Sequence, residues 1–93
     1  MRDNTLYDRT YTEVQSAFFR EQREKNGRTL DDVAYFVNVK KTTYYGYERG
    51  RRDMPMSVFI DLCRLYNLNY AKVFEQLNKE TEKRCGKTAL DDR

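Results

Sequence analysis

The chain has 93 residues, of which 35% are charged and 14% are aromatic, and its formal net charge is +3 at pH 7. A chain of this length fits one small domain with its function on the surface, because a deep enclosed active site is difficult to build at this size. It contains no histidine, which excludes Ser-His and Cys-His nucleophilic pairs and the usual zinc sites, so neither a metal nor a cofactor is expected.

The N-terminal residues 1–9 show no periodicity and are expected to form a flexible arm. They have no apolar segment of the kind found in secretory signals, and no apolar run in the chain reaches membrane-spanning length. A cytoplasmic protein is therefore expected. Thr10 and Glu13 have the spacing of a capping box, which predicts a first helix that begins at Thr10 and ends at Asn26 and Gly27.

Two short helices joined by a tight turn are predicted next. Thr29 caps the first of them. Its apolar residues lie at i, i+3, i+4 and i+7, the spacing of one helix face: Leu30, Val33, Ala34 and Val37. Asn38 suits the turn, because asparagine tolerates the left-handed backbone conformation. The next helix is expected from about Lys41 to Glu48, with Tyr44 and Tyr47 facing inward.

Two further helices complete the prediction. The fourth begins at Pro55, and Asn69 caps a fifth whose pattern fades beyond Asn78. No strand pattern of useful length is present, so the fold class is all-α with five helices. We place the folded domain at residues 10–78 and a polar, partly helical extension at residues 79–93. Cys63 and Cys85 lack the spacing of a paired motif and are expected to be unpaired.

Positive charge is concentrated in one segment. From Lys40 to Arg52 there are five basic residues and one acid, so the rest of the chain is slightly acidic although the total is +3. A local excess of this kind favours an anionic partner over a general effect on solubility.

The chain resembles a known family in the segments NGRTLDDVA, VNVKKTTYYGYERG and LYNLNYAKVF. In their order and spacing they are similar to the helix-turn-helix domain of the phage lambda and 434 repressors and Cro, over a stretch from Phe19 to about Phe74. This resemblance implies a compact five-helix, lambda-repressor-like domain with the helix-turn-helix at the second and third helices. In that family the third helix enters the major groove of DNA.

The resemblance also implies which residues contact DNA. The base-facing candidates are Lys41, Thr42 and Tyr45, and the candidates for phosphate contact are Lys40, Arg49, Arg51 and Arg52. Alternatives without DNA contact remain open. Lys41 could be a solvated surface lysine, and Thr42 could simply favour the helix start. The arginines could form an ordinary hydrophilic loop. Gly46 departs from the family, because that position often carries a base-reading side chain. Either the helix approaches DNA unusually closely there, or direct readout is reduced.

Two structural roles are also implied by the resemblance. Arg23 and Glu48 fall where the family often has a salt bridge between the first helix and the end of the recognition helix. Members of the family commonly dimerise through the fifth helix, which makes Tyr70, Phe74 and Leu77 the candidates for a dimer contact. The same residues could instead close the core.

The leading hypothesis is a sequence-specific DNA-binding transcriptional regulator, a repressor of phage or mobile-element type that acts as a homodimer on double-stranded DNA. The alternative is a protein-interaction module, such as an antitoxin or a small mobile-element inhibitor, that retains the helix-turn-helix fold. An enzyme is not expected. The neighbouring acids Asp31 and Asp32 point to different faces of a helix, and a capping role explains them better than catalysis.

Overall fold

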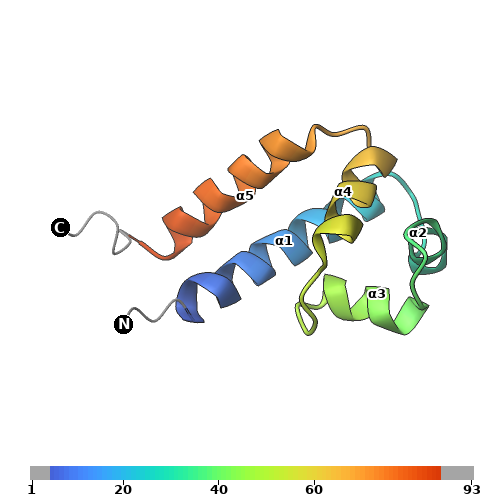
Figure 1. Cartoon of the computed structure of the whole chain (residues 1–93), viewed down its shortest axis with the longest axis horizontal. Coiled ribbons are helices and arrows are strands. Elements are labelled where there is room, and N and C mark those ends of the chain that lie inside the picture. Colours follow the sequence, from blue (N-terminus) through green and yellow to red (C-terminus); the bar gives the residue numbers. More distant parts are fainter. Residues whose placement is uncertain (1–4, 87–93) are drawn as a thin grey trace.

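The computed structural model describes residues 5–86 and contains five α-helices in that range, with no strand. They are α1 (Thr5–Lys25), α2 (Leu30–Phe36), α3 (Lys41–Glu48), α4 (Met56–Leu65) and α5 (Tyr70–Arg84). The long helices α1 and α5 run antiparallel beside each other, and α2 and α3 lie at the end of the molecule where α1 finishes (Figure 1). The expected all-α, five-helix fold is confirmed. Within the described range, no helix is long and apolar enough to cross a membrane.

The first four helices end in the same way. A residue with positive φ follows each of them: Gly27, Asn38, Gly50 and Asn67. The next residue then donates its N–H to a carbonyl five positions back, for example Val39 to Ala34 at 3.0 Å and Arg51 to Gly46 at 2.9 Å. This is the Schellman pattern, which satisfies carbonyls that the helix itself leaves free. It turns the chain back sharply, so five helices fit in a small volume.

The start of α1 differs from the prediction. The helix begins at Thr5, so the expectation of a flexible arm over residues 1–9 and of a capping box at Thr10 is wrong for the part that the structure describes. The hydroxyl of Tyr7 donates to Oδ1 of Asn78 on α5 at 2.6 Å. This contact with a distant element stabilises the start of α1, ahead of the predicted Thr10. Residues 1–4 lie outside the described range.

The core is formed by apolar residues from all five helices. Phe19 of α1, Val33 of α2, Tyr44 of α3 and Leu62 of α4 are fully buried, and Val73 of α5 is almost so. The aromatic rings meet edge to face, with centroids 5.7 Å apart for Phe19 and Phe59. Burial of these side chains is the main favourable contribution to folding, at about 1.5–3 kcal/mol for each large residue.

The fifth helix extends the folded unit past Asn78. α5 continues to Arg84, and Thr81 in this last part is fully buried, with its Oγ1 donating to the carbonyl of Leu77 at 2.7 Å. Part of the segment that we expected to be a polar extension therefore packs against the domain. Residues 87–93 lie outside the described range.

Candidate nucleic-acid interface

Side chains of α1 hold the C-terminal end of α3 in place. Ser16 donates its hydroxyl to the carbonyl of Tyr47 at 2.6 Å, and Nη1 of Arg20 donates to the carbonyl of Glu48 at 3.0 Å. The last carbonyls of a helix lack partners within it, so these bonds cap α3 from outside. Neither Ser16 nor Arg20 could be recognised from the sequence, because no local pattern links residues some thirty positions apart.

An ion pair reinforces this attachment. Nε of Arg23 lies 2.9 Å from Oε2 of Glu48, and Nη2 lies 3.1 Å from Oε1, so the two groups form the fork that arginine and carboxylate prefer. The Glu48 side chain is 2% exposed and that of Arg23 is 15% exposed. The hydrogen bond to Glu48 raises the pKa of Arg23, which fixes its charge. These are the two residues that the family resemblance paired.

The two faces of α3 carry different chemistry. Tyr44, Tyr47 and Glu48 are buried against the core, whereas Lys41 and Tyr45 are exposed on the other side. The N-cap residue Lys40 makes no side-chain hydrogen bond to the first turn, and that turn contains no acid. The start of the helix therefore presents free N–H groups and the positive end of the dipole, which favour an anion. The outer side of α3 packs against none of the other four helices in residues 5–86 (Figure 1).

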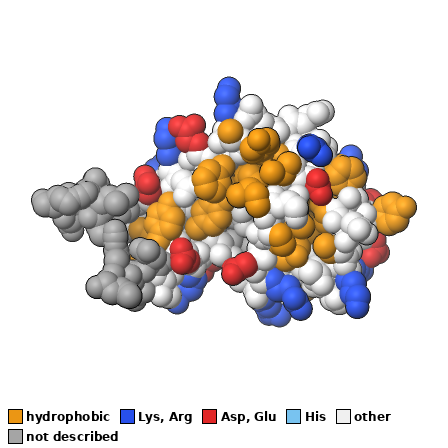
Figure 2. All heavy atoms as spheres, viewed as in Figure 1, with side chains coloured by type: hydrophobic (Ala, Val, Ile, Leu, Met, Phe, Trp, Pro, Cys, Tyr) orange, Lys and Arg blue, Asp and Glu red, His pale blue; other side chains and the backbone are white. Residues whose placement is uncertain are grey.

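The arginines that follow α3 lie beside this outer face. The guanidinium of Arg49 sits over the ring of Tyr45, 5.4 Å from its centroid, in a cation–π contact. Arg51 and Arg52 are exposed in the loop after Gly50. Basic side chains are visible along the edge of the molecule that α3 forms (Figure 2). The structure thus brings Arg49 beside Tyr45 and Arg52 beside Gly46.

Gly46 is the exception among them. It is buried although it lies on the outer face of α3, because the side chain of Arg52 covers it. A Cβ atom added to Gly46 would lie 3.0 Å from Cδ of Arg52, closer than side chains normally approach.

Lys41 also has a neighbour that the sequence pattern did not reveal. Its Nζ lies 3.6 Å from Oδ2 of Asp31 in the first turn of α2, and both side chains are largely exposed. An exposed pair of this kind contributes little to stability. Its consequence is electrostatic, because it places one negative charge beside a candidate DNA-binding lysine.

The second helix of the pair is fixed by its own cap. Oγ1 of Thr29 accepts a hydrogen bond from the N–H of Asp32 at 3.0 Å, and Oδ2 of Asp32 accepts one from the N–H of Thr29 at 3.3 Å. These reciprocal bonds form a capping box. Asp32 thus belongs to the cap of α2, whereas Asp31 is paired with Lys41.

Two tyrosines, the buried Tyr44 and the partly buried Tyr66, lie near the ion pair. Within residues 5–86, the hydroxyl group of Tyr66 is enclosed without a hydrogen-bond partner, and that of Tyr44 is enclosed beside the carboxylate of Glu48. Burial, and then the nearby Glu48 carboxylate, raise the pKa of Tyr66 to about 12, and the pKa of Tyr44 is raised for the same reasons. Both side chains therefore remain neutral under ordinary conditions and act as packing groups.

The candidates for a dimer contact divide into two groups. Tyr70 and Phe74 on α5 are 53% and 44% exposed, but Leu77 is only 2% exposed and packs in the core. Leu77 is therefore not available to a partner, and its assignment to a dimer surface is wrong. Hydrophobic side chains gather across the middle of the face shown in Figure 2. A groove between α1, α4 and α5 is lined there by Tyr11, Met56 and Phe74, among others.

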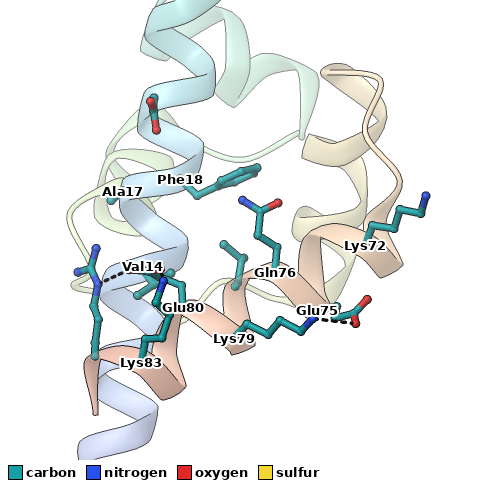
Figure 3. Close-up of a pocket in the computed structure, with 12 residues that line it drawn as sticks. Val14, Ala17, Phe18, Lys72, Glu75, Gln76, Lys79, Glu80 and Lys83 are labelled. Carbon is teal, nitrogen blue, oxygen red and sulfur yellow. Dashed lines mark hydrogen bonds and ion pairs between the residues drawn. The ribbon is translucent and has the colours of Figure 1, made fainter. Parts of the chain in front are cut away.

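A second groove lies between α1 and α5 alone (Figure 3). Its floor is apolar, and Phe18 and Gln76 point into it. The charges along its rim are largely paired with one another, as in Lys79 with Glu75 at 3.6 Å and Arg84 with Glu80 at 3.0 Å. A rim of neutralised charge does not favour an anionic ligand, so this groove is not a second nucleic-acid site.

Metal and thiol chemistry find little support in the structure. Among residues 5–86 there is no cluster of three or more His, Cys, Asp or Glu side chains that could hold a metal ion. Cys63 and Cys85 are free thiols. Burial raises the pKa of Cys63 to about 11, which makes this thiol unreactive.

Comparisons with known proteins agree with this geometry. Residues 16–73 match the model of a family described as a helix-turn-helix domain. A protein of Thermococcus kodakarensis, provisionally named an HTH-type transcriptional regulatory protein, is 26% identical over 72 residues, which are 77% of this chain and 23% of that protein. A similarly named protein of Saccharolobus solfataricus is 29% identical over 56 residues, which are 60% of this chain and 18% of that protein. The chain thus spans less than a quarter of the length of these relatives.

A solved structure shares the fold. The crystal structure of the clp gene regulator ClgR from Corynebacterium glutamicum aligns with a TM-score of 0.69 over 86% of this chain and 85% of that one. The aligned sequences are 21% identical, so the likeness concerns the arrangement of the helices.

Proposed function

This chain belongs to the helix-turn-helix domain family, and we propose that it is a sequence-specific DNA-binding transcriptional regulator that inserts α3 into the major groove. The observation that carries the proposal is the outer face of α3. It is free of other helices, begins at an uncapped helix N-terminus and is flanked by basic residues on both sides. We further place the chain with the lambda and 434 repressors and Cro, from the order and spacing of the matching segments, and we expect it to repress.

The proposed contacts divide by chemistry. Lys41, Thr42 and Tyr45 project from the exposed side of α3 toward base edges. Lys40, Arg49 and Arg51 flank the helix, where phosphate oxygens would lie. The names of the relatives from Thermococcus and Saccharolobus favour the same role. A role on chromosomal DNA also favours the cytoplasm as the place of action.

We propose a homodimer that reads two half-sites about one helical turn apart. Tyr70 and Phe74 are exposed on α5, and Phe74 lines the apolar groove between α1, α4 and α5. Tyr70→Lys is the cleaner test, because Phe74 also packs on Phe59 with ring centroids 6.3 Å apart. Tyr70→Lys should shift the protein toward monomer in sedimentation equilibrium, while Tyr35→Lys on α2 should leave the dimer intact. An unchanged mass for both variants would refute this interface.

The decisive experiment is selection of bound sites from a random pool of DNA duplexes. A symmetric enriched motif is expected. Affinity for the selected site should fall with salt, and Lys40→Ala or Arg51→Ala should each reduce the log–log slope by about 0.9. The matched control is Lys79→Ala on α5, which removes one exposed positive charge away from α3 and should leave the slope unchanged. If no site is enriched and the protein binds DNA weakly at every salt concentration, it is not a DNA-binding regulator.

A second candidate is a protein-interaction module that has kept the fold. Tyr35 and Phe36 favour it, because these adjacent aromatic residues on α2 are 88% and 49% exposed. Aromatic side chains are enriched at the energetic centres of protein interfaces. In that case the site selection gives no motif, and substitution of Tyr35 and Phe36 with serine abolishes binding to the protein partner.

A further inference from the structure

The outer face of α3 has a gap at Gly46 that a distant side chain fills. Gly46 follows Thr42 by one helical turn and therefore lies on the same face, away from the buried Tyr44 and Glu48. Cδ and Cγ of Arg52 lie 3.0 Å and 3.2 Å from the place where a Cβ of residue 46 would be. The stem of Arg52 is thus laid across the helix at the position of the missing side chain.

The backbone explains why Arg52 reaches this position. Gly50 has φ +72° and ends α3, and the chain then turns back on the helix. The carbonyl of Gly46 accepts the N–H of Arg51 at 2.9 Å and that of Arg52 at 3.3 Å. Arg52 therefore starts directly beside Gly46, with its side chain directed along the outer face. A Cβ at position 46 would be tighter against Arg52 than side chains normally pack, so the Arg52 side chain would have to shift.

The head group of Arg52 is available to a ligand. Among residues 5–86 its guanidinium makes no hydrogen bond or ion pair, in contrast to Arg23, which is paired with Glu48, and Arg49, which lies on Tyr45. Arginine presents five N–H donors in a rigid fork. The stem is held against α3 while the donors remain unsatisfied, which is the arrangement expected of a preorganised contact.

We infer, on the basis of the proposed DNA-binding function, that Arg52 reads a guanine edge in the major groove in place of the side chain that Gly46 lacks. A guanidinium held over the middle of α3 lies closer to base edges than one on the flanking loop, and its fork matches O6 and N7 of guanine. A phosphate contact by Arg52 would not require a glycine at position 46, because a flexible arginine side chain can reach phosphate whatever residue stands there. Glycine is also unfavourable inside a helix, and the space that it leaves for Arg52 accounts for its presence.

The test compares four variants on the site selected by the wild-type protein and on duplexes with each base pair replaced in turn. Arg52→Ala should lose the preference for one G·C pair in each half-site by roughly tenfold or more, with other positions unchanged. Arg52→Lys should keep affinity for unrelated DNA but lose this preference, because lysine lacks the fork. Arg51→Ala, the matched control in the same loop, should weaken binding to all sequences alike.

Gly46→Ala distinguishes an effect on the position of Arg52 from an effect on folding. The added methyl group should displace Arg52 and weaken the guanine preference, while thermal unfolding shows a helix that is at least as stable as before. If Arg52→Ala weakens every sequence equally, Arg52 is a phosphate contact and the inference is wrong, although the regulator function stands. If the wild-type protein selects no sequence at all, the proposed function fails and the inference fails with it.

Discussion

The guanidinium of Arg23 and the carboxylate of Glu48 form a two-point ion pair that joins the last turn of α1 to the end of α3, with N–O distances of 2.9 Å and 3.1 Å. Nη1 of Arg23 also donates to the carbonyl of Arg28, in the loop before α2. One arginine thus connects three segments of the chain. The orientation of α3, and with it the candidate DNA-binding face, depends on this pair.

The pair should respond asymmetrically to substitution. Arg23→Met leaves a carboxylate that is 2% exposed without its partner and should cost about 3–5 kcal/mol of the free energy of unfolding. Glu48→Gln keeps an acceptor in place and leaves an arginine that reaches water, so we expect a cost of about 1–2 kcal/mol. Urea denaturation of both variants measures this difference. Equal costs would show that the burial of Glu48 does not govern the energetics.

The raised pKa of Tyr66 predicts that the protein loses stability at high pH. Burial raises the pKa of Tyr66 to about 12, above its unfolded value near 10. The folded state therefore holds the proton more tightly, so this contribution is fully present below pH 10 and is lost as the pH rises toward 12. The urea concentration at the midpoint of denaturation should therefore decrease as the pH rises from about 10 to about 12.

Tyr66→Phe provides the control for this pH dependence, because it should make the alkaline fall less steep, while Tyr44 and Cys63, whose pKa values are also raised, still contribute. At neutral pH the variant should be equally stable, or more stable by up to about 1 kcal/mol, since it removes a buried hydroxyl group without a hydrogen-bond partner. A clear loss of stability at pH 7 contradicts the absence of a partner for this hydroxyl.

The fold could be predicted from the sequence because its signals are local. Helical spacing of apolar residues identified α2, and residues that tolerate positive φ, such as Asn38 and Gly50, marked the ends of helices. The start of α1 was predicted incorrectly, because the contact that extends it joins Tyr7 to Asn78, 71 positions away. Local patterns contain no information about such a pairing.

The candidate site could be predicted only in part, for a related reason. The sequence identified Gly46 as unusual but left two explanations open, closer approach to DNA or weaker readout. The structure adds a third, because Arg52 returns to cover the glycine after the turn at Gly50. Leu77 was assigned to the dimer surface but is buried in the core. Helical spacing alone does not distinguish a core residue from an interface residue on the same helix.

The capping box of α2 gives a third prediction. Thr29→Ala removes the acceptor for the N–H of Asp32 and should lower the free energy of unfolding by about 1 kcal/mol. Thr29→Ser keeps the hydroxyl group and serves as the matched control, with little or no loss. Thermal unfolding followed by circular dichroism distinguishes them. If both variants lose the same stability, packing of the threonine methyl group, rather than the cap, is responsible.

The fourth prediction concerns the charge beside Lys41. Asp31→Asn removes the carboxylate 3.6 Å from the Lys41 ammonium group, and we expect folding stability to change by less than about 0.5 kcal/mol because both side chains are exposed. DNA affinity should rise by several-fold at low salt, corresponding to roughly 1 kcal/mol for one unit charge at this distance in water. The gain should shrink as salt is added, because the screening length shortens.

Asp61→Asn is the control that separates position from total charge. Asp61 forms an exposed pair with Arg64 on α4, with an N–O distance of 4.0 Å, so its removal changes the net charge by the same amount. If Lys41 lies in the DNA interface, only Asp31→Asn should tighten binding in a fluorescence anisotropy titration. The gain should also disappear in the double variant Asp31→Asn with Lys41→Ala. An equal gain from Asp61→Asn would assign the effect to the overall charge of the protein, and Lys41 would lose its proposed place in the interface.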